Sequence, residues 1–99
     1  MSNYSRAATH ERRVKRQLEA AGYFVVRSAG SKGIADLVAL PRGGGRPLII
    51  QCKSRAVRAS AAELELLRRT AETFGATAVV AQGAELTELL VHRPGSRTG

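Results

Sequence analysis

Two apolar segments joined by a glycine-rich turn constrain the fold of this chain most strongly. Residues 34–40 read IADLVAL and residues 48–53 read LIIQCK, and the stretch between them, PRGGGRP, has the composition of a hairpin loop. We therefore expect two antiparallel strands at the centre of the fold.

Polar side chains interrupt these two otherwise apolar strands. Because side chains alternate along a strand, Gln51 and Lys53 share one face while Cys52 points to the other, into the core. Folding the hairpin about Gly44 brings Asp36 level with residues 51–53, to within a one-residue slip of register. An acid, an amide and an amine are thus expected to converge.

The charge balance indicates a folded protein with a polyanionic partner. The chain has 99 residues, 16 Lys and Arg against 8 Asp and Glu, a formal net charge of +8 and 43% apolar residues. This apolar content argues against a disordered basic tail, and the charge favours nucleic acid. We expect one domain over residues 1–99, with flexible ends at 1–4 and 94–99.

The sequence offers no membrane or zinc-binding pattern. No apolar run approaches the ~20 residues that span a bilayer, and no signal-peptide pattern opens the chain. We therefore expect a cytoplasmic protein, in the host cytoplasm if it is of phage origin, without membrane association. With one cysteine and no Cys/His cluster, neither an internal disulfide nor a zinc site is expected.

The remaining segments predict the order helix, three strands, helix, two strands. Helical spacing runs from about Ser5 to Gly22, residues 23–28 read as a strand, and Ser60 with Glu63 forms a capping box that opens a second helix. Strands are expected at 77–81 and 85–91. A helix between the third and fourth strands permits a parallel crossover, so the predicted sheet is mixed. The apolar positions of the second helix are expected in the core: Leu64, Leu67, Ala71 and Phe74.

Glu11 lies on the apolar stripe of the first helix. It follows Ala7 by four positions and precedes Val14 by three, so its carboxylate faces the core side. The alternative is that Glu11 lies at the edge of the stripe and reaches solvent or pairs with an arginine. His10 and His92 have no partner that suggests catalysis, and both are expected at the surface.

Oxygen donors in this arrangement suit a hard divalent cation. The Asp36 carboxylate, the Gln51 amide oxygen and a backbone carbonyl such as that of Cys52 would offer Mg²⁺ or Mn²⁺ a site. The ion would lower the pKa of a bound water, and Lys53 could orient that water or stabilise charge at a scissile phosphate. Glu11 would hold a second ion or a metal-bound water. These residues predict a metal-dependent phosphodiesterase.

A helical Glu11, then Asp36, then Gln51-Cys52-Lys53 resembles the pattern of the PD-(D/E)xK nuclease superfamily. Residues 23–33, YFVVRSAGSKG, are similar to those of the archaeal-type Holliday junction resolvases, and the similarity covers roughly residues 7–81. It implies a restriction-endonuclease-like α/β fold, in which helices flank a central mixed β-sheet in the order α-β-β-β-α-β-β. It also implies a homodimeric, Mg²⁺-dependent endonuclease that resolves four-way DNA junctions by paired symmetric nicks, with Mn²⁺ as a substitute and no small-molecule cofactor.

The resemblance assigns residues to roles. Glu11, Asp36 and Gln51 fall on the metal ligands, and Lys53 completes the catalytic set. Family arginines fall on Arg12 and Arg27, and the loop serine falls on Ser31. With the other cations near the site, the expected DNA-binding residues are Arg12, Arg13, Arg16, Arg27, Ser31, Lys32, Arg55 and Arg58.

Two departures keep alternatives open. Gln51 replaces the usual acid, which removes one negative charge from the cation site, and one extra residue, Ile34 or Ala35, precedes Asp36. Activity is favoured because Glu11, Asp36 and Lys53 keep their positions. The alternatives are a catalytically weak or inactive protein that binds branched DNA, another superfamily nuclease that acts on flaps or duplex, and a basic RNA-binding module.

Overall fold

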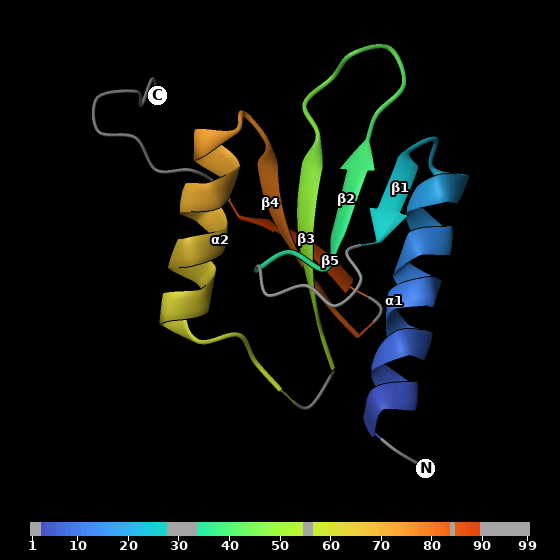
Figure 1. Cartoon of the computed structure of the whole chain (residues 1–99), viewed down its shortest axis with the longest axis vertical. Helices are drawn as coiled ribbons and strands as arrows, with labels where there is room; N and C mark the ends of the chain where they lie inside the picture. Colours follow the sequence, from blue (N-terminus) through green and yellow to red (C-terminus); the bar gives the residue numbers. More distant parts are fainter. Residues whose placement is uncertain (1–2, 28–33, 55–56, 84, 90–99) are drawn as a thin grey trace.

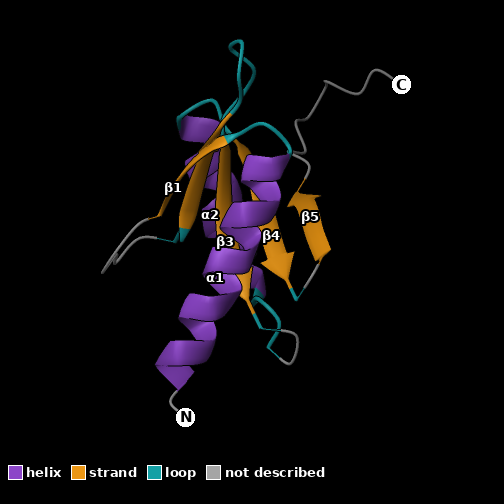
Figure 2. Ribbon diagram, turned by 90° about the vertical axis from the view of Figure 1, so that its right-hand side faces the viewer, coloured by secondary structure: helices purple, strands orange, loops and turns teal. Residues whose placement is uncertain are grey.

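A five-stranded mixed sheet with a helix on each face forms the protein. The computed structural model describes residues 3–27, 34–54, 57–83 and 85–89. In chain order the elements are α1 (Asn3–Ala20), β1 (Phe24–Arg27), β2 (Leu37–Leu40), β3 (Leu48–Lys53), α2 (Ala61–Thr73), β4 (Thr77–Gln82) and β5 (Glu85–Leu89). Figure 1 shows the strands between the two helices, and Figure 2 shows the same arrangement from the side. The predicted order of elements is confirmed.

The sheet order is β1-β2-β3-β4-β5, and only its centre is parallel. β2 and β3 pair antiparallel through the predicted hairpin, whose loop has Gly43 and Gly44 at positive φ of 77° and 91°. β3 and β4 pair parallel, because α2 carries the chain back across the sheet between them. The mixed sheet expected from the sequence is therefore present.

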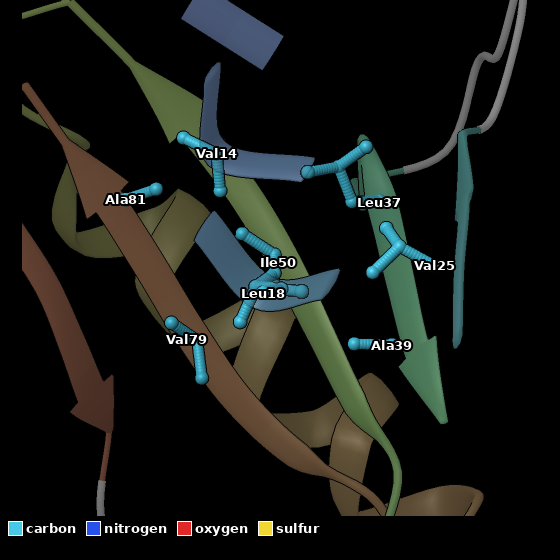
Figure 3. Packing of buried hydrophobic residues seen from close by; sticks show 8 residues of the cluster. All are labelled: Val14, Leu18, Val25, Leu37, Ala39, Ile50, Val79 and Ala81. Atoms are coloured by element: carbon cyan, nitrogen blue, oxygen red, sulfur yellow. The ribbon is translucent and has the colours of Figure 1, made fainter. Parts of the chain in front are cut away.

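The core consists of one apolar cluster on each face of the sheet. α1 places Val14 and Leu18 against Leu37, Ile50 and Val79, as Figure 3 shows. On the other face α2 is packed against the strand residues that alternate with these; that cluster contains Leu67, Ala71, Ile49, Ala78 and Val80. Neighbouring residues of β3 thus serve opposite layers, since Ile50 faces α1 and Ile49 faces α2.

The start of α2 agrees with the sequence expectation, and its end does not. The α2 capping box is present as predicted, with the Ser60 side chain accepting from the Glu63 N–H. Phe74, however, is not in the core, and 75% of it is exposed. The helix ends at Thr73 and Phe74 is its C-cap, so its side chain leaves the helical stripe; Ala76 is buried instead.

Candidate active site

Asp36 lies where the β2–β3 ladder stops, in a geometry that resembles a β-bulge. Leu37 is the ladder partner of Ile50, yet the Asp36 N–H also donates to the Ile50 carbonyl, at 2.8 Å. Two residues of one strand therefore face one residue of the other. Beyond this point the Asp36 side chain continues the pairing, since its Oδ2 accepts from the Cys52 N–H at 2.8 Å. The carboxylate is thereby fixed against β3, within the one-residue slip expected.

The surroundings of Asp36 disfavour its charged form. Burial raises its pKa above the usual range, the hydrogen bond from the Cys52 N–H acts in the opposite direction, and the charge of Glu11 adds to the increase. The charges of Lys53 and His10 lower it. A cation bound at this carboxylate would offset the cost of its ionisation.

Gln51 supplies a buried oxygen that has no partner. It lies between Ile50 and Cys52, the two β3 residues that bond Asp36, and only 7% of it is exposed. Its Oε1 has no hydrogen-bond partner within the described part of the chain. Burying such an oxygen is unfavourable unless a donor or a cation satisfies it. A divalent cation would satisfy it, so the donor set fits a metal ion at this point.

Lys53 lies on the same face as Gln51 and is held by α2. Its Nζ donates to Glu63 Oε2 at 3.0 Å. Cys52 points to the α1 face, as predicted, where it packs at the edge of the core. Burial, followed by the charges of Asp36 and Glu11, raises the pKa of its thiol to about 12, so the thiol is protonated and unreactive at neutral pH.

Glu11 approaches the site from the other face of the sheet. Its Oε1 accepts from Arg27 Nε at 2.9 Å, and its side chain is 19% exposed, so it is partly buried and, as in the alternative above, paired with an arginine. α1 covers the face opposite Gln51 and Lys53. The predicted site residues are therefore divided between the two faces of the sheet. Glu11 lies on the α1 side, whereas Gln51 and Lys53 lie on the α2 side. Asp36 lies at the strand end, where the charges of Glu11 and Lys53 both act on its pKa.

The donor set is poor in acids. Over residues 3–27, 34–54, 57–83 and 85–89, no group of three or more His, Cys, Asp or Glu side chains is placed to hold a metal ion. A metal site at Asp36 would therefore need ligands of other kinds, and the Gln51 amide oxygen is a candidate.

His10 is not the surface residue expected from the sequence. Its Nε2 lies 3.3 Å from the carbonyl of Ala81, to which it is hydrogen-bonded, and it is partly buried. This bond ties α1 to the end of β4. In the sequence, only its position next to Glu11 indicated that His10 could lie near the site. Sequence spacing did not show that β4 ends close to this turn of the helix.

The predicted DNA-binding residues fall into three groups. Arg12, Arg13 and Arg16 are exposed on α1, and Arg58 is exposed before α2. Arg27 is exposed as well but shares its charge with Glu11. Ser31, Lys32 and Arg55 lie outside the described residues.

The chain was compared with known protein families and structures. A family model described as archaeal Holliday junction resolvase (Hjc) matches residues 2–97. The crossover junction endodeoxyribonuclease Hjc of Methanocaldococcus jannaschii is 47% identical over 51 residues, which cover 52% of this chain and 36% of that protein. The match thus spans about a third of that relative's length.

A solved structure agrees with the fold. Archaeoglobus fulgidus Hjc, described as a Holliday junction resolvase from an archaeal hyperthermophile, superposes with a TM-score of 0.66 at 33% identity. The superposition covers 83% of this chain and 70% of that one. The overall fold of this chain is therefore similar to that of this solved structure.

Proposed function

We propose, because the chain belongs to the archaeal Holliday junction resolvase family, that it is a metal-dependent endonuclease that resolves four-way DNA junctions by paired symmetric nicks. One observation supports this most: Gln51, whose buried amide oxygen has no partner in the described part of the chain, lies in β3 between the two residues that bond Asp36, a carboxylate that burial makes costly to ionise. A divalent cation removes both costs. No small-molecule cofactor enters the proposal.

The residues would divide the work as follows. Asp36 and Gln51 would hold the ion, with Glu11 contributing from the α1 side, and the oxygen ligands favour Mg²⁺, with Mn²⁺ as a substitute. When bound, the ion would supply Lewis-acid chemistry and an activated water. Lys53, on the face of Gln51, would orient that water and stabilise charge on the phosphate.

The exposed cations of α1 would bind the DNA backbone. Arg12, Arg13 and Arg16 project from one helix, and Arg58 lies before α2. Phosphate contacts of this kind give affinity without sequence information, so selectivity would come from the shape of the junction. Ser31, Lys32, Arg27 and Arg55 complete the proposed contact set. A DNA substrate of this kind would be met inside the cell, so we propose a cytoplasmic location. Among the described residues, no helix is long and apolar enough to cross a bilayer.

Paired nicking requires two active sites, and we propose a homodimer. The faces of α2 and the last strands, which the sequence offered as candidates, are used in part by the core, since Leu67 and Ala71 are buried there. The exposed apolar side chains of Phe24 and Leu40, at 67% and 43% exposure, are ladder partners near the β1 edge. They support this edge as the contact between copies.

A junction-cleavage assay tests the proposal. We expect a synthetic four-way junction incubated with Mg²⁺ to be nicked in pairs near its branch point, and linear duplex, flap and structured RNA to be left intact. Asp36→Asn should lower the cleavage rate by at least about 10²-fold, because it keeps the oxygen that accepts from Cys52 but loses the charge. Lys53→Ala should do the same, and both variants should still bind the junction.

Each alternative has its own outcome in this assay. Junctions that bind but stay intact in both Mg²⁺ and Mn²⁺ would indicate a protein that only binds branched DNA, the alternative that the missing negative charge at Gln51 leaves open. Equal cleavage of flap or duplex would indicate another nuclease of this superfamily. Tighter binding of RNA would contradict a DNA substrate.

A further inference from the structure

Both oxygens of the Glu63 carboxylate are in use, and they serve different purposes. Oε1 accepts from the Ser60 N–H at 2.8 Å, which is one half of the capping box of α2. Oε2 accepts from Lys53 Nζ at 3.0 Å. The other half of the box, from the Glu63 N–H to Ser60 Oγ at 3.1 Å, fixes the backbone of the same residue. The carboxylate that holds Lys53 is therefore itself held by the start of a helix.

Lys53 is constrained at its backbone as well as at its tip. Its carbonyl accepts from the Gly83 N–H at 3.2 Å. The connector after it is held by Gln82, whose Nε2 donates to the carbonyls of Ser54 and Val57. The Lys53 side chain is 19% exposed. These contacts fix the backbone from which the side chain starts; because a lysine side chain is flexible when free, the ion pair with Glu63 is what holds the amine at its tip.

Glu63 acts on Lys53. Its two carboxylate oxygens are taken up by Lys53 Nζ and by the Ser60 N–H. Glu63 is thus placed to orient the amine.

We propose that Glu63 is a positioning residue that holds the Lys53 amine in its place for phosphodiester cleavage, and that the bond from the Ser60 backbone N–H to its other carboxylate oxygen keeps the carboxylate in position. This inference rests on the proposed nuclease function. A helix-start motif would thereby set the geometry of a catalytic side chain, as reactions that depend on orientation require.

Glu63→Gln separates the two uses of the carboxylate. Glutamine can also complete a capping box, so its one oxygen would accept from the Ser60 N–H. Its NH₂ group would then face Lys53, and the Lys53 amine would lose the oxygen that accepts its hydrogen bond. We expect the single-turnover rate of junction cleavage to fall by roughly 10- to 100-fold. The dissociation constant for the junction should change less than twofold, and the melting temperature should be nearly unchanged.

Two controls make the effect specific. Glu65→Gln is the same substitution on the same helix, where the carboxylate pairs with Arg68, and it should leave the cleavage rate unchanged. Ser60→Ala removes the hydroxyl half of the box while leaving the Glu63 side chain on Lys53, so it should lower the melting temperature with little change in rate.

The outcomes are distinguishable. If the wild-type protein cleaves junctions and Glu63→Gln cleaves at the same rate, the positioning role is overturned while the nuclease function stands. A rate loss matched by equal losses in Ser60→Ala would show a structural role only and would also overturn it. If the wild-type protein does not cleave, the proposed function fails, and this inference fails with it.

Discussion

Gln51 is a polar residue at a buried position of β3 whose neighbours Ile49 and Ile50 are apolar. It occupies a buried position of a central strand, next to the fully buried Ile50, yet its amide oxygen has no partner in the described part of the chain. Leaving a buried acceptor unsatisfied costs about 1–3 kcal/mol. Departures of this kind concentrate where function demands them, which supports the proposal that this oxygen binds a cation.

Replacing Gln51 with methionine should separate stability from metal response. Gln51→Met keeps the volume and removes the orphaned oxygen, so the free energy of unfolding without metal should rise by about 1 kcal/mol. The stabilisation that Mn²⁺ gives the wild-type protein should be lost in the variant. Thermal unfolding with and without Mn²⁺ measures both quantities.

Gln82→Met is the matched control. Gln82 lies at the end of β4, and its Nε2 donates to two carbonyls, so the same substitution should destabilise the protein. A Gln51→Met variant that is less stable than the wild type and still responds to Mn²⁺ would remove the basis for a metal ligand at this position.

At the scale of elements, short-range patterns predicted most of the fold. The hairpin followed from the glycine-rich turn, the parallel crossover from the helix between β3 and β4, and the start of α2 from Ser60 and Glu63. Each of these features is encoded within a few residues of sequence.

Features that depend on contacts between distant segments were not predictable in this way. Spacing brought Asp36 level with Gln51 but did not show the shared partner at Ile50. Nor did it show that α1 covers the face opposite Gln51, because amphipathicity says which side of a helix is buried and not which face of a sheet it meets. The link between Lys53 and Glu63 likewise required the fold.

The end of α2 gives a direct test of element-level packing. Leu67 and Phe74 lie seven residues apart and were expected on one buried stripe, but Leu67 is fully buried and Phe74 is 75% exposed. Leu67→Ala should lower the free energy of unfolding by about 2–5 kcal/mol, whereas Phe74→Ala should change it by less than about 0.5 kcal/mol. Denaturant unfolding measures both values, and equal losses would show that Phe74 belongs to the core.

At the scale of the whole molecule, the charge suits a polyanionic partner. The formal net charge is +8, and the exposed Arg12, Arg13 and Arg16 lie on the helix that also carries Glu11. A phosphate backbone bound along α1 would approach the strand end that holds Asp36, where charges from both sides of the sheet meet. The family match over residues 2–97 covers all of these elements.

Crystals of the protein soaked in Mn²⁺ would test the central claim most directly, through the anomalous signal of the ion. The account predicts one strong peak bonded to both the Asp36 carboxylate and the Gln51 Oε1, and its loss in Asp36→Asn crystals treated in the same way. A peak that lies elsewhere, or one that contacts Asp36 while Gln51 turns away to a protein donor, would contradict it.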